Sequence, residues 1–304
     1  MSDKQTTARR DFTQKRHSSS YDTVSPLKLD LSGRYVLVTG TAFETGVGFA
    51  TAMAFARAGA SGIALFDLHG VSDDLVSKLR HAAVDAGRSE PSIISCTVDI
   101  SDAAAVQAAH AKVSEAFNGR LDVVINNAAH MEPYERFLDA DPDVYWRTWQ
   151  VNLGGLFNMA RAFLPNLLST RADIGDGLCT MVNVSSSGAL SARPASTGYR
   201  SSKLAVTRWT ESLQLDYADE GLLTFSVNPG AIKTEITKGG VPDHVRDRLP
   251  DRPDIAGDTI VWLAASRPEW LAGRYVSCPW DMEELQQMKE DIVKEDKLKL
   301  KMAF

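Results

Sequence analysis

The sequence has little cysteine, with three residues in a chain of 304. Cys96, Cys179 and Cys278 are far apart and form no CxxC pair. A disulfide framework or a structural zinc site needs several ligands at short, regular spacing, so neither is expected and we predict no metal site. Unpaired cysteines of this kind are typical of a reducing compartment.

Long apolar runs are also lacking. The chain has no run of about 18 apolar residues, the length that a transmembrane helix needs. Its N-terminus also lacks the apolar core of a secretory signal. We therefore predict a cytoplasmic protein without a membrane partner.

The chain does not have the excess of positive charge that nucleic-acid binding requires. Its formal net charge is −6, with 33 Lys and Arg against 39 Asp and Glu, so no nucleic-acid partner is expected. Apolar residues make up 44% of the sequence, which is enough for a full hydrophobic core. The length is ordinary for a single α/β domain.

Short apolar runs alternate with stretches of helical periodicity along most of the chain. Strands that are apolar throughout and alternate with helices indicate a parallel sheet covered on both faces. We therefore predict a single α/β domain with a doubly wound parallel sheet of the Rossmann type. The predicted strands are 35–38, 63–66, 93–98, 121–125, 180–184, 223–227 and 275–277, and the predicted helices are 49–58, 103–117, 142–168, 199–218 and one through 260–263.

Composition divides the chain into three parts. Residues 1–28, rich in Ser, Thr, Lys and Arg, are predicted to be a flexible N-terminal extension. Residues 29–280 form the predicted Rossmann-type catalytic domain, and the highly charged residues 281–304 form a solvated C-terminal helix or tail. A loop rich in proline and charge, 237–253, interrupts the alternation and is expected at the surface.

The turn after the first predicted strand contains Gly40, Gly46 and Gly48. Glycines there let the backbone approach a pyrophosphate, and the following helix, from Val47, offers N–H groups and the positive end of its dipole. The spacing is not GxGxxG, so an ordinary left-handed turn explains these glycines equally well.

Asp67 ends the second predicted strand, 27 residues after Gly40. A carboxylate there can accept hydrogen bonds from the adenosine ribose and repel a 2′-phosphate. No Lys or Arg stands beside Asp67 or between Thr39 and Val47, so NAD is favoured over NADP as the cofactor. The alternative is a loop carboxylate of the kind common at strand ends.

Ser186, Tyr199 and Lys203 follow the fifth predicted strand. Tyr199 and Lys203 are four residues apart, so they project from one face of a helix. An ammonium beside a phenol favours the phenolate and lowers the pKa of Tyr199, which could then exchange a proton with an alcohol oxygen. Ser186 could hold the same oxygen. A solvated helix face often carries such a pair, so the spacing alone does not establish the chemistry.

Taken in order, these motifs resemble those of the short-chain dehydrogenase/reductase family, and of its fungal-type members in particular. The similarity covers about residues 30–280, and the combined order and spacing are specific although each motif is modest. The matching residues are Thr39, Gly40, Gly46, Gly48, Asp67, Asp99, Ile100, Asn127, Ala128, Ala129, Asn152, Ser186, Tyr199, Lys203 and the segment 229–234.

The resemblance implies an NAD(P)-dependent alcohol dehydrogenase or ketoreductase that moves hydride between nicotinamide and a secondary alcohol or ketone. It implies a catalytic set of Asn152, Ser186, Tyr199 and Lys203, with Asn152 bending its helix and holding a water in a proton relay. The loop 235–253 would cover the substrate. The cofactor-binding residues it implies are Gly40, Gly46, Val47, Asp67, Asp99, Ile100, Asn127, Ala128, Tyr199, Lys203, Pro229, Ile232 and Thr234.

Two features depart from the family pattern. The glycine turn is two residues longer than TGxxxGxG, as in enoyl-reductase members. Those enzymes place the lysine seven residues after the tyrosine, where this chain has Val206, so enoyl reduction is disfavoured. The longer turn leaves the pyrophosphate contacts of residues 41–45 undefined. Ala129 stands where the family usually has glycine, which we expect to matter little.

The segment 273–281 resembles tails of fungal members from natural-product pathways, which points to a bulky, secondary-metabolite-like small-molecule substrate. The resemblance also implies a homodimer or homotetramer that pairs through the helices carrying Asn152 and Tyr199. Phe157, Phe163 and Trp209 are candidate contacts or core residues. A non-redox role, as an isomerase or a cofactor-binding scaffold, remains the alternative.

Overall fold

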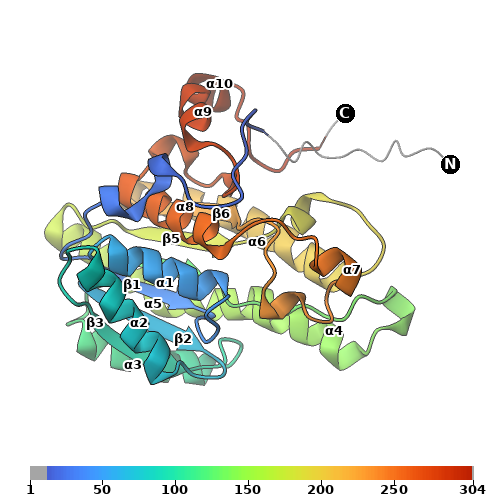
Figure 1. The fold of residues 1–304 in the computed structure, drawn as a ribbon, viewed down its shortest axis with the longest axis horizontal. Coiled ribbons are helices and arrows are strands. Elements are labelled where there is room, and N and C mark those ends of the chain that lie inside the picture. Colours follow the sequence, from blue (N-terminus) through green and yellow to red (C-terminus); the bar gives the residue numbers. More distant parts are fainter. Residues whose placement is uncertain (1–11, 303–304) are drawn as a thin grey trace.

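Seven parallel strands form one sheet in the order β3-β2-β1-β4-β5-β6-β7 (Figure 1). The structure is a computed structural model that describes residues 12–302. The predicted α/β fold with a doubly wound parallel sheet is confirmed, because the order reverses between β1 and β4. The strands are β1 (Tyr35–Thr39), β2 (Gly62–Asp67), β3 (Ser92–Thr97), β4 (Val123–Asn126), β5 (Thr180–Val184), β6 (Leu223–Asn228) and β7 (Tyr275–Ser277).

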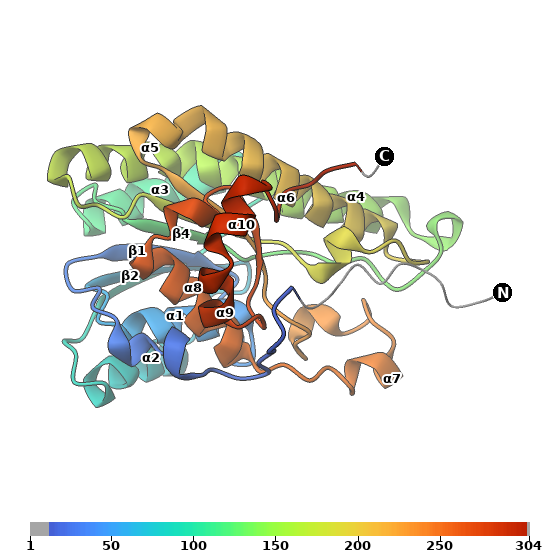
Figure 2. The ribbon, with the colours of Figure 1, turned by 90° about the horizontal axis from the view of Figure 1, so that it is seen from above.

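Helices cover both faces of the sheet (Figure 2). One layer contains α1, α2 and α8, and the other contains α3, α4, α5 and α6. The helices are α1 (Val47–Arg57), α2 (Asp73–Asp85), α3 (Ala103–Ala116), α4 (Pro142–Trp149), α5 (Leu156–Ile174), α6 (Thr197–Tyr217), α7 (Asp243–Arg246), α8 (Pro253–Ser266), α9 (Met282–Gln287) and α10 (Lys289–Lys294).

The two layers explain why the strands are apolar throughout. Every residue of β2, β5 and β6 is buried, because each strand contributes side chains to both faces. Val38 and Leu65 join the cluster beneath α1 and α8, whereas Leu37 and Phe66 join the cluster beneath α3 and α5. Neighbouring residues on one strand thus belong to separate cores.

Helix α2 is absent from the prediction, which placed no helix between the second and third strands. Its start has a clear signal, since the Ser72 hydroxyl accepts a bond from the Leu75 nitrogen at 3.4 Å and Asp73 and Asp74 lie in the first turn. Leu75 and Leu79 are buried, so an apolar spacing of four residues also indicated this helix.

The end segments pack against each other, contrary to the expectation of a flexible extension and a solvated tail. The first described residues lie beside α9, and the chain then passes along α8 toward α1 (Figure 1). The His17 ring contacts the Asp281 carboxylate at 2.8 Å, and the Met282 nitrogen donates to the Tyr21 hydroxyl at 2.7 Å. Val24 is fully buried. Residues 1–11 and 303–304, which belong to the predicted extension and tail, lie outside the described residues.

Candidate functional site

A cavity of about 1620 Å³ opens at the carboxyl ends of the strands. This is the edge at which an open α/β sheet binds its ligands. All of the predicted cofactor-binding residues line it, and so do Ser186, Tyr199 and Lys203. Asn152 does not line it. The fold therefore brings these predicted residues, apart from Asn152, to one cavity.

Two positions around the turn between β1 and α1, Gly40 and Gly48, have room only for glycine. Gly40 has a φ of +77°, and a Cβ added there would lie 2.7 Å from Nδ2 of Asn127. A Cβ on Gly48 would lie 2.1 Å from the Gly40 carbonyl oxygen. The glycines therefore let the turn pack closely against α1 and the end of β4.

Asn127 holds this turn in place as well as lining the cavity. Its Nδ2 donates to the carbonyl oxygens of Thr39 at 2.8 Å and Gly40 at 3.2 Å. The Thr39 hydroxyl in turn accepts from the nitrogens of Asn127 and Ala128, each at 2.9 Å. These bonds tie β1 to β4 at the point where the strand order reverses.

Asp67 is fixed by backbone donors. Its Oδ2 accepts from the Ala42 nitrogen and its Oδ1 from the His69 nitrogen, both at 2.9 Å. Ala42 lies in the lengthened glycine turn, so Asp67 connects this turn to the end of β2. Only 8% of Asp67 is exposed, and the residue still borders the cavity.

Asp99 lines the cavity with both carboxylate oxygens occupied. Its Oδ2 accepts from Arg147 at 2.7 Å and its Oδ1 from the Ser101 hydroxyl at 2.7 Å. These hydrogen bonds and the Arg147 charge outweigh desolvation and lower the pKa of Asp99. Ile100 is buried beside Gly155, where a Cβ would meet its side chain at 2.6 Å. Arg147 is a cavity residue that sequence reasoning missed.

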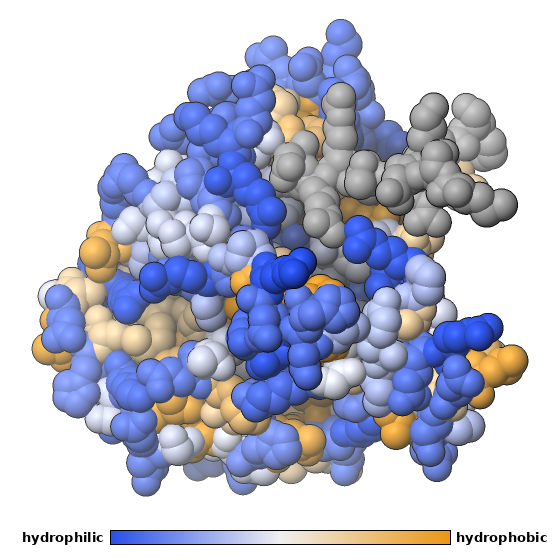
Figure 3. Space-filling model, turned by 45° about the vertical axis from the view of Figure 1, so that its right-hand side comes forward, coloured by the Kyte–Doolittle hydropathy of each residue, from blue (hydrophilic) through white to orange (hydrophobic). Residues whose placement is uncertain are grey.

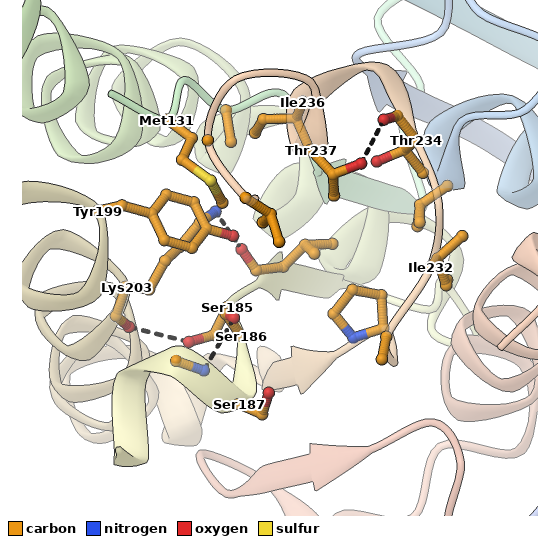
Figure 4. Close-up of a pocket in the computed structure, with 18 of the residues that line it drawn as sticks. Met131, Ser185, Ser186, Ser187, Tyr199, Lys203, Ile232, Thr234, Ile236 and Thr237 are labelled. Atoms are coloured by element: carbon orange, nitrogen blue, oxygen red, sulfur yellow. Dashed lines mark hydrogen bonds between the residues drawn. The ribbon is translucent and has the colours of Figure 1, made fainter. Parts of the chain in front are cut away.

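Ser186, Tyr199 and Lys203 meet at one end of the cavity, across from the segment that carries Thr234 (Figure 4). Ser186 follows β5, and its Oγ accepts from the Gly188 nitrogen at 2.9 Å. Tyr199 and Lys203 come from one face of α6, as predicted, with the Lys203 Nζ 5.8 Å from the centre of the Tyr199 ring.

The electrostatics of this pair differ from the prediction. Burial raises the pKa of Tyr199, while a hydrogen bond with the Ser186 side chain acts to lower it. The Lys203 Nζ donates to the Val184 carbonyl oxygen at 2.7 Å. Burial also lowers the pKa of Lys203 to about 8.

Asn152 lies behind the main cavity, in a π-helical turn (Gln150–Gly155) between α4 and α5. Its Oδ1 accepts from the His130 nitrogen at 2.8 Å, and its Nδ2 donates to the His130 oxygen at 2.9 Å. The π turn agrees with the predicted irregularity of this helix. Asn152, Asn126, Asn183 and Lys203 border a second cavity of about 10 Å³, roughly the room that one water molecule needs.

Glu132 is a buried carboxylate that the sequence did not indicate. Only 3% of it is exposed. One carboxylate oxygen accepts from the Tyr199 nitrogen and the other from the Thr148 hydroxyl, each at 2.9 Å. Glu132 belongs to no motif, and its partners are 67 and 16 residues away along the chain, so only the fold reveals its place under α6.

The far side of the cavity is formed by the segment after β6. Pro229, Ile232 and Thr234 line it, and so do twelve residues of the predicted covering loop, 235–253. This loop contains the short helix α7 and approaches the opposite wall, where a Cβ on Gly240 would lie 2.3 Å from the sulfur of Met131. Its position above the site agrees with the predicted covering role.

The described residues 12–302 contain no cluster of three or more His, Cys, Asp or Glu side chains that could hold a metal ion. The three cysteines are buried and free. No helix within the described part of the chain is long and apolar enough to cross a membrane.

A family model for short chain dehydrogenases matches residues 34–244. The chain belongs to the short chain dehydrogenase family. The short chain dehydrogenase mpl6 of Monascus purpureus is 40% identical over 290 residues, covering 95% of this chain and 96% of its own. The short chain dehydrogenase pigC of Monascus ruber is 37% identical, and the match covers 97% of this chain and 94% of pigC. The predicted likeness to fungal members is thereby confirmed.

A solved structure shares the fold of this dehydrogenase. The 3-ketoacyl-(acyl-carrier-protein) reductase from Brucella melitensis, complexed with NADH, matches with a TM-score of 0.69 and 25% identity. The match covers 82% of this chain and 97% of the reductase. Family, fold and site together make this dehydrogenase an oxidoreductase.

Proposed function

We propose that this dehydrogenase moves a hydride between a nicotinamide cofactor, NAD in preference to NADP, and a secondary alcohol or ketone. The observation that carries the proposal is the meeting of Ser186, Tyr199 and Lys203 at one end of the large cavity. A similar fold binds NADH in the reductase from Brucella melitensis.

The glycine turn and α1 fit a dinucleotide. Helix α1 begins after Gly46, which has no side chain to bond the first free N–H groups. Gly46 and Val47 border the cavity, so this helix end can meet a pyrophosphate. The bound cofactor would accept or supply the hydride.

The preference for NAD rests on Asp67. Its carboxylate lies at the cavity wall, held by the Ala42 and His69 nitrogens. A fixed negative charge there favours a ribose hydroxyl and opposes a 2′-phosphate. The adjoining cavity residues are Leu68 and His69, so that segment offers no Lys or Arg to pair with a 2′-phosphate.

The side chains at the Tyr199 end of the cavity would donate or accept the proton of the reaction. Ser186 can hold the substrate oxygen, and the Tyr199 phenol can give a proton to that oxygen in reduction or take one in oxidation. Because burial raises the pKa of Tyr199 in the free protein, a positive charge beside it would aid the phenolate. Lys203 would supply this charge once its ammonium turns from the Val184 carbonyl toward the cofactor ribose.

The cavity also supports a bulky substrate. Its volume of about 1620 Å³ exceeds the range of roughly 300–1,000 Å³ that is typical of ligand pockets. A dinucleotide would fill part of this space and leave room at the Tyr199 end. The identity of the substrate and its secondary-metabolite character stay predictions.

A homodimer or homotetramer also stays a prediction, as does a cytoplasmic location. Phe157 on α5 is 55% exposed and Trp146 on α4 is 61% exposed, which supports pairing through this layer. Phe163 is 1% exposed and belongs to the core, so it is not an interface residue. Trp209 is partly buried against the same core. On the face in Figure 3, hydrophobic residues form small groups between hydrophilic ones.

The test is a titration with NAD and NADP, followed by a screen of secondary alcohols and ketones for a change in the absorbance of reduced nicotinamide. We expect Tyr199→Phe to lower kcat by about a hundredfold or more, because it removes the proton donor and acceptor. Tyr217→Phe, on the same helix but outside the cavity, should retain activity. Tight NAD binding without hydride transfer across a broad panel would instead support the non-redox alternative.

A further inference from the structure

The substrate end of the cavity carries arginines that form no ion pair with any described residue, although the charge of Glu132 acts on one of them, Arg200. Within residues 12–302, Arg193, Arg200 and Arg248 line the cavity and none has an ion-pair partner. This contrasts with the chain as a whole, which has a net charge of −6. The unpaired charge at this end of the cavity is therefore opposite in sign to the net charge of the protein.

The carboxylates that line the cavity are all engaged elsewhere. Asp67 accepts from two backbone nitrogens, and Asp99 is paired with Arg147 at 2.7 Å. Glu235, on the covering loop, is paired with Lys238 at 2.6 Å. None of these acids is available to the three unpaired arginines, so their charge is left for a ligand.

Arg200 is the most confined of the three. It follows Tyr199 in the first turn of α6, and its stem lies 3.7 Å from the position of a Cβ on Gly188. Its Nε is buried and has no hydrogen-bond partner among the described residues. Its Nη1 makes only long contacts with Ser191, at 3.4 Å to the hydroxyl and 3.5 Å to the carbonyl oxygen.

A partly buried guanidinium whose Nε has no hydrogen-bond partner in the described part of the chain is costly to the folded protein. Burial lowers the pKa of Arg200, and the nearby charge of Arg193 acts in the same direction. A guanidinium has five N–H donors in a planar fork that matches a carboxylate. An anion placed between Arg200 and Arg193 would satisfy these donors and remove the repulsion of the two charges.

We infer that Arg200, assisted by Arg193, forms an anion-binding subsite that recognises a carboxylate on the substrate. The inference rests on the proposed function, because it names the substrate class as an alcohol or ketone that also bears a carboxylate. Arg200 adjoins Tyr199 and the loop at Gly188, whereas the dinucleotide features belong to the turns after β1 and β2. The carboxylate is thus a substrate group, and the cofactor pyrophosphate binds elsewhere.

The test compares three ketones that carry a carboxylate with their neutral carboxamides. The probes are 3-acetylbenzoate, 4-acetylbenzoate and 6-acetyl-2-naphthoate, which place the carboxylate at different distances from the ketone. Binding to the NADH-loaded protein is measured by calorimetry, separately from NADH oxidation. Charge-assisted hydrogen bonds predict that at least one carboxylate binds about ten- to a hundredfold more tightly than its carboxamide.

Arg200→Gln should abolish this preference, and Arg200→Lys should retain part of it. Arg80→Gln makes the same charge change on the exposed face of α2, outside the cavity, and should leave the preference intact. The affinity for NADH should be unchanged in all three variants. This comparison separates a local contact from the overall charge of the protein.

Equal binding of every carboxylate and its carboxamide to the wild type would overturn the subsite. So would a preference that survives in Arg200→Gln, or a matching loss of NADH affinity, which would assign Arg200 to the cofactor. Carboxylate-selective binding without NADH oxidation would leave the subsite standing and count against the proposed hydride transfer. Oxidation of NADH without carboxylate selectivity would support the proposed hydride transfer and overturn the subsite.

Discussion

The carboxylate of Glu132 accepts a hydrogen bond from the backbone nitrogen of Tyr199 at 2.9 Å. Its second oxygen accepts from the hydroxyl of Thr148 on α4, also at 2.9 Å. Ser196, the residue before α6, makes no side-chain cap bond of its own. Glu132 therefore caps the helix that carries Tyr199 and ties it to α4, so we regard it as a positioning residue.

Glu132→Gln tests the charge of this residue separately from its hydrogen bonds. The negative charge of Glu132 acts to raise the pKa of Tyr199. Without that charge, the rising limb of the pH profile for alcohol oxidation should move to lower pH, by up to about one unit. The measurement is kcat/KM against pH for wild type and variant.

Glu132→Ala provides the comparison, because it also removes the acceptor for the Tyr199 nitrogen. It should lower the free energy of unfolding by about 1–3 kcal/mol and reduce kcat. Glutamine, which keeps an acceptor oxygen, should retain most of the stability. A pH profile that stays fixed in Glu132→Gln would show that the residue acts only through structure.

Lys203→Met should change how stability depends on pH. Burial lowers the pKa of Lys203 from 10.5 to about 8, so between these values the unfolded chain binds more protons than the folded one. The wild type therefore gains stability from this residue as the pH rises through that window. Near pH 7 the variant should be the more stable, by up to about 3 kcal/mol less the lost hydrogen bond to Val184.

The advantage of Lys203→Met should shrink toward about pH 10, as measured by urea unfolding at a series of pH values. Lys112→Met, which replaces an exposed lysine on α3, serves as the control and should show little dependence. A constant difference between Lys203→Met and wild type would contradict the role of burial.

Asp67→Asn should weaken the discrimination between NAD and NADP. The change removes the negative charge that opposes a 2′-phosphate, and asparagine keeps only one acceptor oxygen for the two nitrogens of Ala42 and His69. We expect the ratio of NADP to NAD dissociation constants to fall about tenfold or more. Asp99→Asn removes a charge from the other carboxylate near the dinucleotide and should leave this ratio unchanged. An unaltered ratio in Asp67→Asn would place the source of the preference elsewhere.

Tyr21→Phe should destabilise the contact between the two end segments. The Tyr21 hydroxyl accepts from the Met282 nitrogen at 2.7 Å, and its loss leaves that N–H group without a partner. We expect the free energy of unfolding to fall by about 1–3 kcal/mol. Tyr145→Phe removes a hydroxyl that has no partner within residues 12–302 and should be nearly neutral. Equal stability of the two variants would mean that the end segments contribute little.

The prediction failed where residues far apart in sequence cooperate. Residues 12–28 carry few apolar side chains, so the sequence indicated a flexible extension, yet they are held by partners such as Asp258, Asp281 and Glu284 near the other end of the chain. Local composition contains no trace of such pairing. The hydrogen-bond partner of Lys203 in the free protein also could not be read from spacing, because its Nζ donates to the Val184 carbonyl of a separate strand.

The sequence alone determined the seven strands, most of the helices between them and many residues at the sheet edge, because hydrophobic periodicity, glycine spacing and the Tyr199–Lys203 interval are local properties. Only the tertiary structure decided which charges meet. Glu132 reached the start of α6, Arg147 reached Asp99, and Arg200 was left in the cavity without an ion-pair partner for its charge within residues 12–302. Pairing and burial of charge depend on distances between separate elements, and one-dimensional spacing does not contain those distances.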